Sequence, residues 1–586
     1  MNVAAASAPA PVPGLPPEPS GVEALLLRIG RWGIGLLLAL CVLLALIVPF
    51  HATDALVFGT WSRAIAVEHG WFFDALVGYP PYSRPLFYAP QGWIWAVVGS
   101  HEWIGRLLSL AFFVLLLWCV TKLARGQRLA PGAPLLACVL LLACPDVVQQ
   151  AFAGQTDVPV AALIALAAVG LWCRAPGAAS ALLIAVASCA AVLAKPTALP
   201  ALAGLALAHL IGSLPGLRGR ALLGVVPIAA GTVVALIYDK VMAAHFDLAV
   251  NSFLGGTTAS GDDNAVSRVG DAVSSFSESN GRIALILRAE WLGPYLRIVV
   301  LFALIYAVLR IVRLAHRPAA LAAVAAAVFW YWLGPSILPG GLAPVSTAAG
   351  ARIASILLIG PLLAVAWCPR EWEPDRLWLG RLLVWGVPPL LAWGLFGILG
   401  DTRTLSPAWP ALFLLMATVV AAGVSGLRVR GPLLAAAGVA LLLGIAVADL
   451  RNLDALGARP DGSINSVRAL RDLTPSTWFH PDRARVAADP QLGGLVNGIR
   501  AARRPGDRVV TNDGRLLFYF LTDADVLAPV PDCAQLRRYG VVALLTNVFG
   551  ADEAAQLAKL RRCPGVRLTP VAATPGSYAV FRVTPA

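Results

Sequence analysis

Several charged side chains lie at the ends of long apolar segments, where ionisable groups are costly and usually functional. They include Asp54, Arg84, Asp157, Lys195 and Arg403. A carboxylate within reach of a hydroxyl group can take its proton as a general base. Cations beside a phosphate stabilise the charge that develops when the phosphate leaves. These residue types at a membrane surface therefore suit chemistry on a charged lipid headgroup, and the alternative is a solvated loop with scattered charges.

The composition indicates a polytopic membrane protein. Of the 586 residues, 58% are hydrophobic and 13% are charged, which is not typical of a soluble enzyme. The formal net charge of +13 does not indicate a nucleic-acid partner, because the basic residues cluster in short loops between apolar segments. The sequence contains neither a CxxC pair nor HExxH, so we expect no zinc site. We expect no cofactor, and nothing in the sequence supports the alternative of a divalent metal ion.

About thirteen segments are long and apolar enough to cross a bilayer. They lie near residues 31–50, 103–123, 131–146, 156–173, 178–194, 197–213, 221–242, 293–313, 319–338, 351–368, 379–399, 405–424 and 431–449. If the N-terminus is cytoplasmic, every predicted inner loop carries Lys or Arg, as the positive-inside rule requires. An odd number of spans then places the C-terminal region outside. This predicted outer side carries Arg352 and the charged residues named above, which are Asp54, Arg84, Asp157, Lys195 and Arg403.

The chain divides into three predicted parts. Residues 1–25 are rich in Ala and Pro and are expected to be disordered and cytoplasmic. Residues 26–450 form the predicted transmembrane domain, with a first outer loop at 51–102 and a second long outer loop at 243–292. Residues 451–586 are richer in Arg and Asp and are expected to form a small extracytoplasmic α/β domain.

The last domain has predicted elements of its own. Period-two apolar runs predict strands at 508–511, 540–546 and 578–583, and an amphipathic stretch predicts a helix at 551–562. Cys533 and Cys563 are the only cysteines of this domain. Because an extracytoplasmic compartment is oxidising, we expect these two cysteines to form a disulfide.

A set of short motifs follows the chain in order. Asp54 comes just after the first span, and an amphipathic stretch from Ala55 ends at Gly70. Ser83-Arg84-Pro85-Leu86 follows, and Gly99-Ser-His-Glu-Trp-Ile-Gly-Arg-Leu opens the second span. Asp157 then begins the fourth span, Lys195-Pro196 ends the fifth, and Arg403-Thr-Leu-Ser-Pro-Ala-Trp-Pro precedes the twelfth.

These motifs, in this order over roughly residues 30–425, resemble those of the GT-C glycosyltransferases. They are most similar to the group of protein O-mannosyltransferases and lipid A aminoarabinose transferases. That group usually has Asp-Glu where this chain has Asp54-Ala55, and Lys where it has Arg84. The resemblance implies the GT-C fold, with about thirteen spans and an outer C-terminal domain. It also implies a polyprenyl-phosphate sugar as the donor.

The candidate residues take roles in such a transfer. Asp54 is the expected base, and its alternative is a helix cap. Arg84 and Arg403 are expected to bind the phosphate, although either side chain could instead snorkel to lipid headgroups. Asp157 is expected to orient a cation or the acceptor, unless it is only the N-cap of its span. Lys195 is expected to bind substrate, and its alternative is to anchor a helix end.

Three further residues are candidates for substrate binding. Arg352 opens the tenth predicted span. Tyr82 and Tyr88 could stack on a sugar or line the path of the lipid tail. Aromatic residues at this depth more often belong to the interfacial belt.

We therefore predict a bacterial glycosyltransferase with multiple spans in the inner membrane. It would move a sugar from a polyprenyl-phosphate carrier to a lipid, glycan or protein acceptor of the cell envelope. Its partners would be the donor, this acceptor and membrane lipid. The alternatives are an oligosaccharyltransferase that uses a diphosphate-linked glycan, a transporter or flippase, and a structural envelope protein. A transporter predicts paired half-repeats, and none is evident in the sequence.

Overall fold

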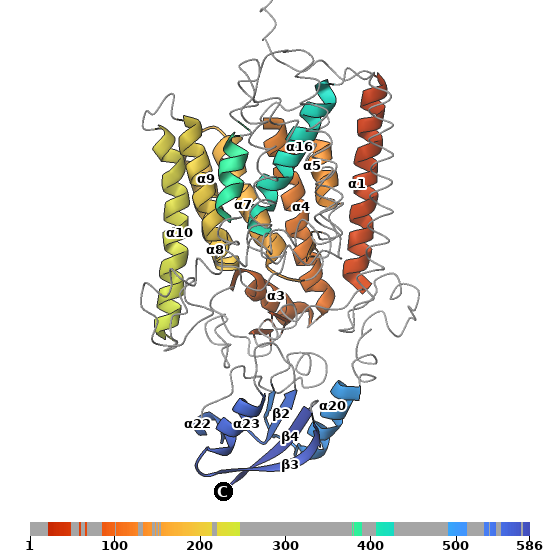
Figure 1. The fold of residues 1–586 in the computed structure, drawn as a ribbon, viewed down its shortest axis with the longest axis vertical. Helices are drawn as coiled ribbons and strands as arrows, with labels where there is room; N and C mark the ends of the chain where they lie inside the picture. Colours follow the sequence, from red (N-terminus) through yellow and green to blue (C-terminus); the bar gives the residue numbers. More distant parts are fainter. Residues whose placement is uncertain are drawn as a thin grey trace, which may run out of the picture.

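The structure is a computed structural model in which a bundle of long helices is followed by a small α/β unit (Figure 1). It describes residues 21–47, 85–99, 101–126, 133–142, 154–213, 220–245, 380–389, 406–426, 490–511, 533–537, 539–545, 553–575 and 578–586, and the single positions 58, 59, 62, 65, 66, 147, 150, 151 and 378. The bundle contains α1 (Gly21–Ile47), α3 (Pro85–Val98), α4 (Glu102–Gly126), α5 (Ala133–Leu142), α7 (Asp157–Trp172), α8 (Ala178–Ala194), α9 (Ala198–Ser213), α10 (Arg220–His245) and α16 (Trp409–Gly426).

Most of these helices lie where the apolar runs predict spans. The helix α8 matches its predicted span at both ends, and α4, α7, α9 and α10 differ from theirs by a few residues. The helix α1 begins at Gly21, so residues 21–25, which we expected to be disordered, are helical. The predicted spans near 293–313, 319–338, 351–368 and 431–449 lie outside the described residues and stay predictions, as does the total of about thirteen.

The helix α3 was not predicted from the sequence, which places residues 51–102 in a loop. Pro85 is the first helical residue, a position that suits proline because the first N–H groups of a helix have no internal partner. One face of α3 buries Phe87, Tyr88 and Trp95. The other face exposes Trp93, Ile94, Val97 and Val98.

The helix α4 runs antiparallel to α1, and α8 runs antiparallel to α7, whereas α4 and α7 run in the same direction. Near the start of α4, the Arg106 guanidinium donates a hydrogen bond to the Ala45 carbonyl near the end of α1, at 2.6 Å. At the other end of α4, the Lys122 carbonyl accepts a hydrogen bond from Cys173, just past α7, at 3.6 Å. The hairpin from α7 to α8 is joined at this same end, where Ser180 donates to the Gly170 carbonyl at 2.6 Å.

The charged residues lie at two opposite ends of the bundle. Lys122, Arg125 and Arg174 lie at the end of the bundle where α4 and α7 finish. We call this the basic end. Asp157 begins α7 and Lys195 follows α8, so both lie at the opposite end. In Figure 1 this opposite end is the one that carries α3 and faces the α/β unit.

The outside of the bundle is strongly apolar, and small side chains lie where some of its helices approach each other closely. The helix α7 is buried along most of its length. Gly231 of α10 approaches the Ala185 carbonyl of α8 so closely that a Cβ atom would clash, which is the small-residue packing common between membrane helices. Large apolar side chains of α1, α8 and α10 are exposed, among them Leu36, Leu182 and Val241. Such a surface suits lipid rather than water.

Two helices of the described residues are long and apolar enough to cross a membrane, at Glu102–Gly126 and Gly224–Val241. Shorter apolar helices lie at Asp157–Trp172, Ala178–Ala194, Ala198–Ile211 and Ser406–Leu415.

The α/β unit contains a four-stranded sheet in the order β1-β2-β4-β3. The strands are β1 (Val509–Thr511), β2 (Val541–Leu545), β3 (Val566–Thr574) and β4 (Tyr578–Pro585), and the helices are α20 (Pro490–Ala502), α22 (Cys533–Leu536) and α23 (Glu553–Arg561). The strands β1 and β2 are parallel, and β4 is antiparallel to both β2 and β3. The predicted strands correspond to β1, β2 and β4 and the predicted helix to α23, whereas α20 and β3 were not predicted.

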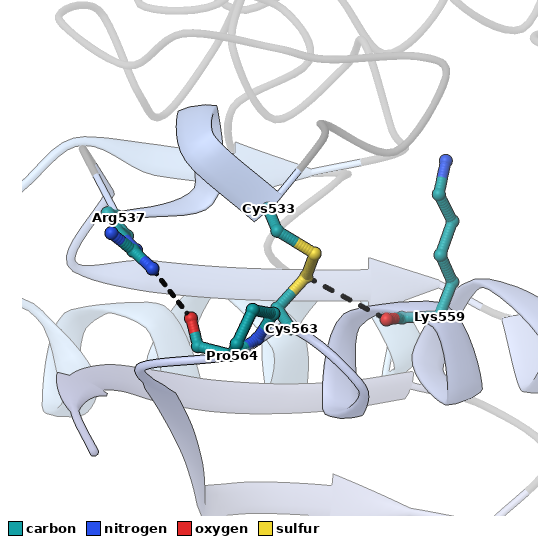
Figure 2. Close-up of a disulfide and its surroundings, with 5 residues drawn as sticks. All are labelled: Cys533, Arg537, Lys559, Cys563 and Pro564. Carbon is teal, nitrogen blue, oxygen red and sulfur yellow. Dashed lines mark hydrogen bonds between the residues drawn. A yellow bond between two sulfur atoms is a disulfide. The ribbon is translucent and has the colours of Figure 1, made fainter.

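Cys533 and Cys563 form a disulfide across this unit, with a Cα–Cα distance of 5.0 Å. It joins the start of α22 to the turn after α23, as Figure 2 shows. On one side of it, Arg537 donates a hydrogen bond to the Pro564 carbonyl at 2.9 Å. The structure therefore pairs the two cysteines that the sequence leads us to expect as partners.

Candidate functional site

Asp157 lies in the first turn of α7, with its side chain 1% exposed. Thr156 occupies the N-cap position and makes no side-chain capping hydrogen bond. The alternative that Asp157 is the N-cap of its span is therefore wrong. A carboxylate in the first turn interacts favourably with the positive end of the helix dipole. This placement helps to stabilise a negative charge away from water.

Lys195 is the residue at which α8 ends. Its backbone is extended, with φ −162° and ψ 126°, as is favoured for a residue that precedes proline. The side chain is 8% exposed, and its Nζ atom lies 2.5 Å from Oδ1 of Asp157. The start of α7 and the end of α8 are therefore joined by a buried ion pair. A cation at a helix C-terminus is also favoured by the dipole.

Ser406 is the third side chain of this site, and the sequence analysis did not select it. It opens the short turn before α16 and is fully buried. Its hydroxyl donates a hydrogen bond to Oδ1 of Asp157 at 3.3 Å. Ser406 belongs to the motif that begins at Arg403, and only the charge and the prolines of that motif drew attention. The signal available in the sequence was a serine inside a motif at the end of a span.

Of the three side chains, Lys195 is the one that can donate hydrogen bonds to an anionic ligand. Desolvation makes a buried ion pair a weak source of stability, so its presence at a helix end invites a functional explanation. A lysine ammonium has three N–H groups, and within the described residues that of Lys195 donates to Asp157 alone. Two N–H groups then remain for a ligand. Among the described residues, no group of three or more His, Cys, Asp or Glu side chains could hold a metal ion.

Tyr88 lies in a small apolar cluster at the same end of the bundle. Its side chain is buried with Phe58, Ile65 and Phe87, and the ring of Phe58 packs edge-on against that of Phe87. The backbone carbonyl of Tyr88 accepts a hydrogen bond from Ser62 at 2.9 Å. These contacts give Tyr88 a packing role in this structure. Its predicted contact with a sugar stays a prediction.

The remaining predicted site residues lie outside the part of the chain that the structure describes. They are Asp54, Tyr82, Arg84, Arg352 and Arg403. The structure thus brings together two of the predicted site residues, Asp157 and Lys195, and adds Ser406 to them. The roles of all these residues stay predictions.

Comparisons with known proteins give structural similarities only. No protein-family model and no curated protein sequence matches the chain. Among solved structures, ArnT from Cupriavidus metallidurans in the apo state is 17% identical, with a TM-score of 0.43 over 95% of this chain and 98% of that one. The structure of the same protein bound to undecaprenyl phosphate is 17% identical, with a TM-score of 0.42 over 96% and 98% of the two chains.

A third similar structure is the arabinofuranosyltransferase AftD from Mycobacteria, at 12% identity and a TM-score of 0.43. The match covers 95% of this chain but only 40% of AftD. ArnT and AftD are both GT-C glycosyltransferases, the family that the sequence motifs resemble. The function proposed for this chain rests on its own residues.

Proposed function

We propose that this protein is a membrane glycosyltransferase that moves one sugar from a polyprenyl-phosphate carrier to an acceptor of the bacterial cell envelope. The observation that carries the proposal is the buried contact of Asp157 with Lys195 and Ser406. It lies at the end of the bundle opposite the basic end, and its two charged members belong to the ordered motifs that resemble those of the GT-C glycosyltransferases.

The proposed orientation follows from the charges. Cytoplasmic ends of membrane helices carry an excess of Lys and Arg, so the basic end with Lys122, Arg125 and Arg174 is cytoplasmic. The opposite end, with Asp157 and Lys195, then opens on the outer face of the inner membrane. In this orientation the N-terminus is cytoplasmic, and the domain of residues 451–586 is extracytoplasmic.

The proposed chemistry assigns one role to each group. The oxygen of the acceptor hydroxyl attacks the anomeric carbon of the sugar, and the carboxylate of Asp54 takes the hydroxyl proton. The bond from that carbon to the phosphate oxygen breaks, and polyprenyl phosphate leaves with the electron pair. Lys195 stabilises the negative charge on the leaving phosphate, since a cation does so most effectively away from bulk water.

The other proposed residues bind and orient the substrates. Asp157 holds Lys195 in place through the ion pair at 2.5 Å. Arg84, Arg352 and Arg403 supply further positive charge for the phosphate. Tyr82 and Tyr88 are the aromatic candidates for the sugar or the lipid tail.

The experiment uses purified protein in lipid nanodiscs, labelled polyprenyl-phosphate sugars and an envelope extract as acceptor. Mass spectrometry follows the glycosylated acceptor and the released polyprenyl phosphate. The proposal predicts that both appear together with at least one donor. Failure of every such donor to release polyprenyl phosphate contradicts it.

A matched pair of variants tests the site. Lys195→Met removes the buried cation, and Lys122→Met removes an exposed lysine of the basic end. Losing one charge-assisted contact costs about 1.5–3 kcal/mol, so Lys195→Met should lower transfer about tenfold to hundredfold. Lys122→Met should transfer at the wild-type rate. Equal rates for the two variants would remove Lys195 from the mechanism.

A further inference from the structure

The geometry points to Ser406 as a positioning residue for the proposed transfer. Through Asp157, it fixes the direction in which Lys195 presents its ammonium group to the carrier phosphate. This inference rests on the proposed function and extends it to an uncharged residue outside the predicted set.

Three segments that are distant in the sequence meet at one carboxylate oxygen. Oδ1 of Asp157 accepts hydrogen bonds from Lys195 at 2.5 Å and from Ser406 at 3.3 Å. The donors lie 38 and 249 positions from Asp157 along the chain, so neither contact is a local helix cap. For comparison, Thr418 on α16 donates to the Leu414 carbonyl four residues earlier, the usual local bond of a hydroxyl in a helix.

The lysine needs such support because its ammonium group sits on a flexible four-carbon stem. The ion pair holds this group only as firmly as the carboxylate itself is held. Carboxylates rotate broadly about their last bond, and a second donor on the same oxygen limits that rotation. Ser406 supplies it from the turn before α16, so three segments of the chain define the position of Lys195.

A neutral hydroxyl suits this role. Serine stays uncharged at neutral pH and is not the proton acceptor of the reaction. Its contact therefore leaves the charge of the ion pair unchanged. The O···O distance of 3.3 Å is longer than that of most hydroxyl hydrogen bonds. We therefore expect an effect at the lower end of the range, about threefold to tenfold in rate.

The test compares Ser406→Ala with Ser188→Ala in the transfer assay. Ser188 lies on α8 and is also fully buried, and within the described residues its hydroxyl has no hydrogen-bond partner. Both substitutions remove one buried hydroxyl group, but only Ser406→Ala removes a contact with Asp157. Ser406→Thr keeps the hydroxyl group and serves as the rescue.

Ser406→Ala should lower kcat about threefold to tenfold and leave the KM for the donor unchanged. Both alanine variants should keep the melting temperature within a few degrees of the wild type. This pattern marks an interaction that acts in the transition state, and a structural role would move the melting temperature without separating kcat from KM. Recovery of kcat in Ser406→Thr supports the inference further.

The outcomes separate the two proposals. If the wild type transfers sugar and Ser406→Ala has the same kcat as Ser188→Ala, the role of Ser406 is wrong and the proposed function stands. If Ser406→Ala lowers kcat only together with the melting temperature, Ser406 has a structural role and the inference is again wrong. If the wild type releases no polyprenyl phosphate from any donor, the proposed function is wrong and the role of Ser406 in it falls as well.

Discussion

Replacing Lys195 by Met should destabilise the folded protein through the carboxylate that it leaves behind. The ammonium and carboxylate groups are 2.5 Å apart, and their side chains are 8% and 1% exposed. Without Lys195, Asp157 keeps only the longer contact with Ser406. Breaking a buried pair on one side costs about 3–5 kcal/mol, because the remaining charge is uncompensated. We therefore expect the melting temperature of the purified protein in detergent to fall.

The second substitution should then restore stability. Asp157→Asn in the Lys195→Met background removes the stranded charge, and an asparagine can still accept a hydrogen bond from Ser406. Replacing both members of a buried pair is often neutral, so the double variant should melt near the wild type. Thermal unfolding of the wild type, both single variants and the double variant gives the coupling energy. Lys122→Met controls for the loss of one positive charge.

Two results would refute this reasoning. If Lys195→Met has the same melting temperature as Lys122→Met, the ion pair is not buried in the folded protein. If the double variant loses as much free energy of unfolding as the two single variants lose together, the two side chains are not coupled.

Three further predictions concern the base, the topology and the disulfide. Asp54→Asn should insert normally, still bind donor and lose at least about a hundredfold in transfer, because general-base catalysis contributes about 10²–10⁴-fold; near-normal turnover would make Asp54 a helix cap, since Asn and Asp are nearly equal as caps. A cysteine can be introduced at Arg125 in a background without other reactive cysteines. It should react with a membrane-impermeant thiol reagent only after the cells are permeabilised. Labelling in intact cells would contradict the proposed orientation. Alkylation under non-reducing conditions should leave Cys533 and Cys563 unmodified, and joint replacement by Ala should cost about 3–4 kcal/mol for a loop of this length; two alkylated thiols in untreated protein would contradict the pairing.

Apolar runs were enough to place the long helices, because a helix that crosses lipid must satisfy its backbone internally over a nearly fixed length. The helix α3 was missed for the opposite reason. It is too short to span a membrane, contains Pro90, and follows a Pro-rich stretch that is typical of a loop. Only its packing against the bundle, with Phe87 and Trp95 buried, accounts for it. The strand β3 was missed because most of its side chains are exposed, so its sequence lacks the alternation of a half-buried strand.

The candidate site also contains residues that the sequence predicted and one that it did not. Asp157 and Lys195 were predicted because charges at span ends are costly and therefore conspicuous in a sequence. Their contact could not be predicted, because it depends on how α7 and α8 pack. Ser406 was missed because serine is common and uncharged. Its contact with a residue 249 positions away becomes visible only in the folded chain.

The most direct test of the account is transfer by the double variant Asp157→Asn with Lys195→Met, which should remain folded. The measurement is the rate at which polyprenyl phosphate is released from a labelled polyprenyl-phosphate sugar, beside the wild type under the same conditions. We predict that the wild type releases polyprenyl phosphate together with glycosylated acceptor and that the double variant is slower by about tenfold to hundredfold. A double variant that is folded and as fast as the wild type would show that the transfer does not use this ion pair.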